Sequence, residues 1–195
     1  MEKVRTFIAI NLPDEVIAEL EKVQHALRAQ LAPDAVRWSQ PPQMHLTLKF
    51  LGDIEVEKIG EVEAALRRAC RNSAPFSLAV QHLGCFPNPR SPRVIWVGIG
   101  GDVGRLHKLQ ASIEREVAGI GEPAEARPFH PHLTLGRVKT TDRRVLRTIG
   151  QSIETTEVAT LGPWAVQQVH LMRSQLSPKG AIYTSLAAIE LAADL

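Results

Sequence analysis

The sequence predicts an α+β fold of two pseudo-symmetric lobes, each a mainly antiparallel sheet with helices on its outer face. Two observations predict this fold class. The tetrapeptide His-Leu-Thr-Leu occurs at 45–48 and again at 132–135, so the two copies lie 87 residues apart. The same β-α-β-α-β order of expected strands and helices surrounds each copy. We therefore expect the two tetrad strands to meet at an active-site cleft between the lobes.

The spacing of apolar residues divides the first half of the chain into strands and helices. A buried strand is expected at 5–10 and an amphipathic helix at 14–28, where apolar residues recur every three or four positions. A proline-containing loop leads to the first tetrad strand at 45–51. A second helix over 56–71 and a strand over 76–83 complete this half.

The second half repeats this order after a loop rich in proline and arginine. A strand at 93–99 precedes a helix at 103–117, and the second tetrad strand at 132–138 precedes a helix near 142–150. A strand near 163–171 then closes the second repeat. Each half thus carries a tetrad strand between two helices.

The chain, residues 1–195, is expected to form a single two-lobed domain, because this length allows one sizeable core. The internal repeat covers roughly 5–84 and 92–171, and a final strand near 181–189 takes the place of a third beginning. No linker rich in glycine or serine separates the halves. We therefore expect two lobes that share one interface.

The composition excludes several classes of protein. A net charge of +2 is too small for a protein that coats DNA, and two cysteines form neither a disulfide framework nor a zinc site. The apolar runs are too short to span a bilayer, and the N-terminus does not resemble a secretory signal. We expect a cytoplasmic protein with no membrane partner. An anionic substrate is compatible, because residues 127–147 carry six basic residues and one acid.

The tetrads have the pattern of a catalytic strand. Side chains alternate along a strand, so His45 and Thr47 share one face while the leucines face the core, and His132 and Thr134 do the same. Two imidazoles with a pKa near 6.5 can serve as the acid and the base that open a phosphodiester. The threonine hydroxyls can donate to the non-bridging oxygens. This chemistry requires no metal and no cofactor.

The histidines also allow other interpretations. A single His-x-Thr is more often the polar face of a half-buried strand, and the repeat is what favours catalysis. His130 and His132 share a strand face and could bind zinc, but no Asp, Glu or Cys follows at a recognisable spacing. The remaining histidines in predicted elements are more typical of surface or packing positions; these are His25, His82, His107 and His170.

The motifs, taken together, resemble those of a known family. Residues 43–52 and 129–137 resemble the paired HxTx motifs of the two-histidine phosphoesterases, and most closely the RNA 2′,3′-cyclic phosphodiesterase branch, also called 2′–5′ RNA ligase-like. Residues 5–10, 36–38 and 92–96 look typical of the same branch. So do several residues near the end of the chain, namely Leu171, Arg173, Ser174, Leu176, Gly180 and Tyr183. The resemblance covers nearly the whole chain.

The resemblance implies a hydrolase of RNA processing that opens a 2′,3′-cyclic phosphate to a 2′-phosphate. It implies that His45 donates a proton to the leaving 3′ oxygen and that His132 is the proton acceptor that activates water. Thr47 and Thr134 would bind the phosphate oxygens. The symmetric pattern of the residues does not by itself decide which histidine is the acid.

Two further residues are candidates for substrate binding. Phe50 could stack on a base, or could pack in the core, since alternation places it with the leucines. Arg137 matches a phosphate-site position of the family, but alternation turns it away from His132 unless a bulge re-aims it; the alternative is a surface position that aids solubility. Arg37 and Arg90 are weaker candidates for the RNA backbone, and His130 could assist or line the rim.

Three functions remain in competition. The first is hydrolysis of RNA ends that carry a 2′,3′-cyclic phosphate, by a protein that we expect to act as a monomer without metal. The second is 2′–5′ joining of RNA ends at the same site. The third is an RNA-terminus binding module without turnover, although a pure binder would not need two acid–base histidines.

Overall fold

The computed structural model describes residues 2–177 and 180–192. Its strands and helices alternate along most of the chain. In chain order they are β1 (Lys3–Asn11), α1 (Asp14–Arg28), β2 (Val36–Trp38), η1 (Pro41–Gln43), β3 (His45–Glu55), η2 (Val56–Lys58), α2 (Ile59–Cys70), β4 (Phe76–Phe86), β5 (Val94–Gly101), α3 (Val103–Glu116), β6 (His132–Val138), α4 (Arg143–Thr155), β7 (Leu161–Val166), β8 (Gln168–Ser177) and β9 (Gly180–Glu190).

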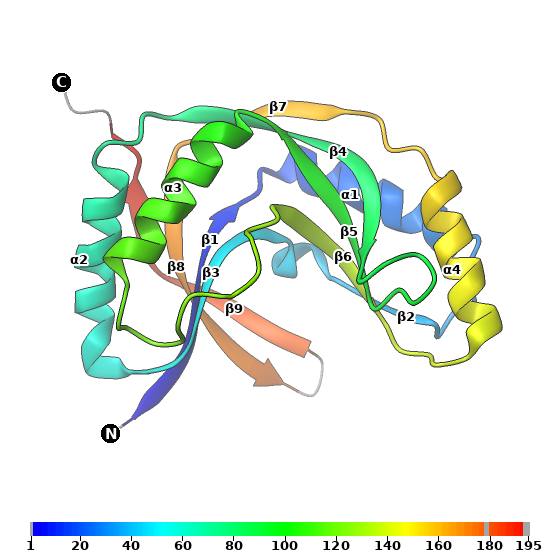
Figure 1. The fold of residues 1–195 in the computed structure, drawn as a ribbon, viewed down its shortest axis with the longest axis horizontal. Coiled ribbons are helices and arrows are strands. Elements are labelled where there is room, and N and C mark those ends of the chain that lie inside the picture. Colours follow the sequence, from blue (N-terminus) through cyan, green and yellow to red (C-terminus); the bar gives the residue numbers. More distant parts are fainter. Residues whose placement is uncertain (1, 178–179, 193–195) are drawn as a thin grey trace.

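The strands form two sheets, and the tetrad strands belong to different sheets. Sheet A has the order β3-β1-β8-β9, and sheet B has the order β2-β6-β5-β4-β7. Every strand pairing described is antiparallel. The helices α2 and α3 pack against sheet A, α1 and α4 pack against sheet B, and both sheets lie between these two helix pairs (Figure 1). The α+β prediction with helices on the outer faces is therefore confirmed.

Each sheet is built from both halves of the chain. Strand β1 belongs to sheet A, but the helix that follows it, α1, packs against sheet B. In the second half, strand β5 belongs to sheet B, but the helix that follows it, α3, packs against sheet A. The third strands are exchanged as well, because β4 pairs with β5 and β8 pairs with β1. A sheet therefore cannot be assigned to one half of the sequence. The division into repeats at 5–84 and 92–171 stays a prediction.

Two expectations about the strands need correction. The expected strand at 163–171 is two strands, β7 in sheet B and β8 in sheet A, so the chain crosses between the sheets at Gln167. Residues 36–38, expected to be part of a loop, form β2 and pair with β6. Both differences come from partners distant in sequence, which local apolar patterns do not contain.

The leucines of both tetrads lie in the core between the sheets and the helices. Leu46, Leu48, Leu133 and Leu135 are at most 3% exposed. The opposite face of each tetrad strand is therefore free to carry polar groups. Strands β3 and β6 also contact each other, so the two sheets meet at the strands that carry the tetrads. None of the helices within 2–177 and 180–192 is long and apolar enough to cross a membrane.

Candidate active site

His45 lies on an aromatic face of sheet A. Its ring stacks on Phe7 at 4.7 Å between centroids, and Tyr183 of β9 meets it edge-on at 5.1 Å. Phe7 and Tyr183 also contact each other, at 5.0 Å. In the register with β1, His45 pairs with Asn11 and Thr47 pairs with Ala9, so the histidine and the threonine share the face of Phe7, as alternation predicts.

His132 lies on a second aromatic face, on sheet B. Phe86 of β4 meets its ring edge-on at 5.0 Å, and Trp96 of β5 lies at 6.1 Å. The register pairs His132 with Gly98 and Thr134 with Trp96, so these two polar side chains again share one face. His130 lies at the rim of the same cluster, with its ring 5.0 Å from Trp96.

Both imidazoles are held by the backbone two residues earlier. The Nδ1 atom of His132 lies 2.7 Å from the carbonyl oxygen of His130. A carbonyl can only accept, so Nδ1 carries the proton and Nε2 is left to face the substrate. At His45 the backbone of Gln43, also two residues earlier, likewise favours the charged ring by hydrogen bonding. This interaction raises the pKa of His45, as it does for His132. Either ring can therefore act as an acid when charged or as a base when neutral.

Burial disfavours the charged form of both rings in the free protein. It lowers the pKa of His45 from 6.5 to about 4, against the opposing effect of the bond to Gln43. Burial also lowers the pKa of His132, and again the bond to the His130 carbonyl opposes the shift. An anion placed between the rings would favour their charged forms and raise both pKa values.

A β-bulge in each tetrad strand changes the expected direction of the next side chains. In β3, Leu48 is skipped in the pairing with β1, so Phe50 pairs with Phe7 and lies on the His45 face. Phe50 is 48% exposed, with its ring 6.2 Å from Phe7. The core-packing interpretation of Phe50 is therefore wrong, because it assumed unbroken alternation.

The same irregularity occurs in β6. Leu135 is skipped in the pairing with β5, so Arg137 pairs with Val94 and lies on the face of His132 and Thr134. The bulge that Arg137 requires is thus present. Its charge also lowers the pKa of His132, although less than burial does.

Arg37 of β2 pairs directly with Arg137, and both side chains are exposed. Two like charges at directly opposed positions destabilise a sheet. Neither guanidinium has an ion-pair partner within the part of the chain that the structure describes. This pair is the local positive charge that an anionic substrate would meet. Arg90 follows β4 in an exposed loop away from these pairings.

Two histidines that the sequence assigned to surface or packing positions lie on or near these faces. His170 of β8 pairs with Ala9 and so lies on the His45 face, where its Nδ1 is 3.2 Å from the Ser185 hydroxyl. His82 has a positive φ of 38° and its ring lies 5.6 Å from Trp96. The sequence also did not assign Phe7 and Trp96 to the site. Alternation places each of them on one face of its strand, but only the sheet order shows that this face also carries a histidine. His25 and His107 are exposed on helices, as expected.

Among the residues that the structure describes, none is placed as a third ligand for a zinc ion at His130 and His132. His130 and His132 have ring centroids 6.4 Å apart, and the Nδ1 of His132 is already bonded to a carbonyl. Within residues 2–177 and 180–192, no group of three His, Cys, Asp or Glu residues is arranged to hold a metal ion.

Comparisons with known proteins agree with this geometry. The family model described as LigT like Phosphoesterase matches residues 10–96 and 100–183. The chain is 35% identical over 191 residues to an RNA 2′,3′-cyclic phosphodiesterase of Methanothermobacter thermautotrophicus, with 97% of this chain and 100% of the relative covered. It is also 35% identical over 194 residues to the enzyme of that name from Thermus thermophilus, with 96% and 90% covered.

Solved structures show the same fold. A crystal structure of a Thermus thermophilus protein superposes with a TM-score of 0.78 at 31% identity, over 98% of this chain and 100% of that one. The crystal structure of E. coli LigT complexed with 3′-AMP superposes with a TM-score of 0.71 at 26% identity, over 97% and 99%.

Proposed function

The chain belongs to the LigT-like phosphoesterase family, and from this premise we propose that it hydrolyses the 2′,3′-cyclic phosphate at RNA ends to a 2′-phosphomonoester. One observation carries the proposal: two His-x-Thr faces occupy the same register positions in β3 and β6, and each imidazole is bonded to the backbone two residues earlier. The relatives named RNA 2′,3′-cyclic phosphodiesterase supply the substrate class. We place the enzyme in the cytoplasm, as a monomer that needs no metal.

The proposed reaction uses one proton at each histidine. His132, whose neutral form is favoured by burial, takes a proton from water as the water oxygen forms a bond to phosphorus. The bond from phosphorus to the 3′ oxygen breaks, and His45 donates a proton to that oxygen. The product is a 2′-phosphate with a free 3′ hydroxyl. One proton has moved onto His132 and one has left His45, so proton exchange with solvent restores the starting state.

Binding of the phosphate prepares His45 for this role. Burial lowers the pKa of His45 to about 4, so the free protein holds little of the charged form at neutral pH. The negative phosphate raises this pKa when it binds beside the ring. Thr47 and Thr134 flank the histidines on the same faces and donate to the non-bridging oxygens. Substrate binding thus creates the acid that the reaction needs.

The remaining groups recognise the rest of the RNA end. Arg137 and Arg37 provide positive charge beside His132 for phosphate oxygens. Phe50, exposed next to Phe7, offers an aromatic face on which a base can stack. The two recognition elements lie on different sheets, on the same faces as the two histidines.

The test is turnover of a short oligonucleotide that ends in a 2′,3′-cyclic phosphate, followed by identification of the product phosphate position. We expect a 2′-phosphate, and we expect the alanine variants of His45 and His132 each to lose roughly 10²- to 10⁴-fold in rate. His25→Ala, at an exposed histidine of α1, is the matched control and should retain full activity. A 3′-phosphate product would reverse the assignment of the leaving oxygen. Tight binding without turnover at any pH would instead support the RNA-terminus binding module.

A further inference from the structure

At each of the two bulges that turn Phe50 and Arg137 to the histidine faces, a glutamine side chain from a helix donates a hydrogen bond to a backbone carbonyl. A residue skipped by a strand pairing leaves its carbonyl outside that ladder, and a buried carbonyl without a donor is costly. In β6 the skipped residue is Leu135. In β3 the residue skipped before Phe50 is Leu48, and Leu51 is skipped further along. Leu135 and Leu48 are both buried, so water is a poor donor for either carbonyl. Each carbonyl needs a donor from the protein.

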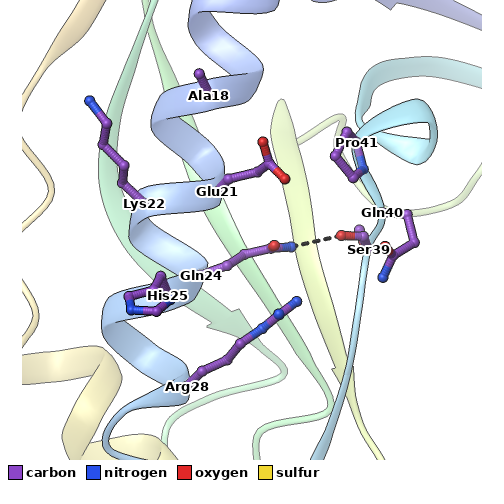
Figure 2. Close-up of a pocket in the computed structure, with 9 residues that line it drawn as sticks. All are labelled: Ala18, Glu21, Lys22, Gln24, His25, Arg28, Ser39, Gln40 and Pro41. Carbon is purple, nitrogen blue, oxygen red and sulfur yellow. Dashed lines mark hydrogen bonds between the residues drawn. The ribbon is translucent and has the colours of Figure 1, made fainter.

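Gln24 of α1 supplies a donor at the first of these carbonyls. Its Nε2 donates to the Leu135 carbonyl at 2.8 Å and to the Ser39 carbonyl at 2.9 Å. The Ser39 backbone N–H also donates to Leu135, at 2.9 Å. Figure 2 shows Gln24 reaching from the helix to Ser39 at a pocket of about 400 Å³ that none of the tetrad residues lines. Gln24 is only 3% exposed, although glutamine is usually a surface residue.

Gln110 of α3 occupies the corresponding place on the other sheet. Its Nε2 donates to the Leu48 carbonyl at 3.4 Å and also to Glu114 at 3.3 Å. Leu48 and Leu135 are the last leucines of the two tetrads, and nearly the same offset along the chain separates Gln24 from Gln110. Each glutamine lies on a helix that follows a strand of one sheet and packs against the other sheet.

We propose that Gln24 and Gln110 are positioning residues, which hold the bulges at Leu135 and Leu48 and so aim Arg137 and Phe50 at the substrate. Without the bulge, alternation would return Arg137 to the core face of β6 and Phe50 to the core face of β3. The glutamine stabilises the bulged register because it donates to the carbonyl of the residue that the strand pairing skips. The role toward substrate rests on the proposed function, whereas the role in holding the register does not.

The main test is Gln24→Met, which removes both donors but keeps an unbranched chain of similar length. We expect kcat/KM for the cyclic-phosphate oligonucleotide to fall about 10-fold or more, because a displacement of about 1 Å at a reacting group can cost up to ~10²-fold. In the combined variant with Arg137→Ala the two losses should not multiply, because both remove the same guanidinium from the substrate. Multiplying losses would overturn the proposal.

Two controls separate positioning from a loss of stability. Gln30→Met changes an exposed glutamine on the turn after α1 and should leave turnover unchanged. Val16→Ala destabilises the core side of α1 without touching Leu135. If Val16→Ala lowers kcat/KM as much as Gln24→Met at a temperature where both are folded, the effect of Gln24 is structural and the proposal is wrong.

A crystal structure of Gln24→Met keeps the result independent of the proposed function. We expect β6 to pair with β5 without the skipped residue, or the Arg137 side chain to leave the His132 face. An unchanged bulge with Arg137 still beside His132 refutes the positioning role. If the wild-type protein shows no turnover, the proposed function fails, and this structure alone decides the role of Gln24. Gln110→Met should reduce turnover by a smaller factor, because its bond to Leu48 is longer.

Discussion

Replacing His45 by phenylalanine should remove a loss of stability that the wild-type protein suffers in mild acid. The ring of His45 stacks on Phe7 and contacts Tyr183, so phenylalanine preserves the ring packing while removing the titrating group. Burial lowers the pKa of His45 from 6.5 to about 4. The unfolded chain therefore binds more protons than the folded protein between these two values. Stability falls as the pH falls through that window.

The size of the effect follows from the two pKa values. Integrating the proton linkage from ~pH 7 to ~pH 4.5, with 6.5 in the unfolded chain and about 4 in the folded protein, gives a loss of about 2 kcal/mol from His45 alone. Burial also lowers the pKa of His132 and His170, so the wild-type protein loses more than this in total. The difference between wild type and His45→Phe isolates the contribution of one ring.

Urea unfolding at a series of pH values measures the effect directly, with m-values compared to check that the unfolding transition is the same. His45→Phe should lose about 2 kcal/mol less than wild type across this range. The same substitution at exposed His25 is the control and should retain the wild-type loss. Parallel stability curves for wild type and His45→Phe would show that burial of His45 does not disfavour its charged form.

Further outcomes are expected for activity. Because burial lowers the pKa of both histidines, the bell-shaped pH profile of kcat/KM should have its optimum below pH ~6.5. The kcat profile should shift to higher pH, because bound phosphate favours the charged rings. A kcat/KM optimum above pH ~8 would contradict this reasoning. Arg137→Ala should lower kcat/KM about 10-fold or more, and Arg137→Lys should show a smaller but still measurable loss. Steady-state kinetics on one oligonucleotide measure both losses. Prolonged EDTA treatment should leave turnover intact, whereas a loss that added zinc restores would support the zinc interpretation. Phe50→Ala should raise KM for an oligonucleotide more than for a cyclic mononucleotide if the ring stacks on a base, and equal effects would oppose stacking.

The sequence predicted the faces of the tetrad strands well, because alternation along a strand is a local property. The leucines are buried and the histidines and threonines share the opposite faces, as the period of two requires. The second tetrad strand has its expected bounds, 132–138. The roles of acid and base stay predictions, because the carbonyl bond is of the same kind at both rings.

The bulges mark the limit of that local reasoning. Whether Leu48 or Leu135 is skipped depends on the register against β1 and β5 and on donors from α1 and α3, all distant in sequence. Simple alternation therefore placed Phe50 on the core face of its strand, and the core-packing interpretation that followed from it is wrong. The division of residues 163–171 between two sheets has the same origin, since strand pairing there is decided by partners elsewhere in the chain.

The two similar histidines differ in the side chains that surround them. Equivalent positions after the bulges hold Phe50 in sheet A and Arg137 in sheet B, and the residues that pair with them are Phe7 and Val94. The guanidinium beside His132 adds to the effect of burial and lowers the pKa of that ring, which favours the neutral form that a base needs. For His45, packed between Phe7 and Tyr183, burial opposes charging, and no cation among the described residues adds to that effect. The two rings therefore differ in their surroundings, and because burial lowers the pKa of His45 to about 4 in the free protein, the prediction that His45 is the acid depends on the rise of this pKa when phosphate binds.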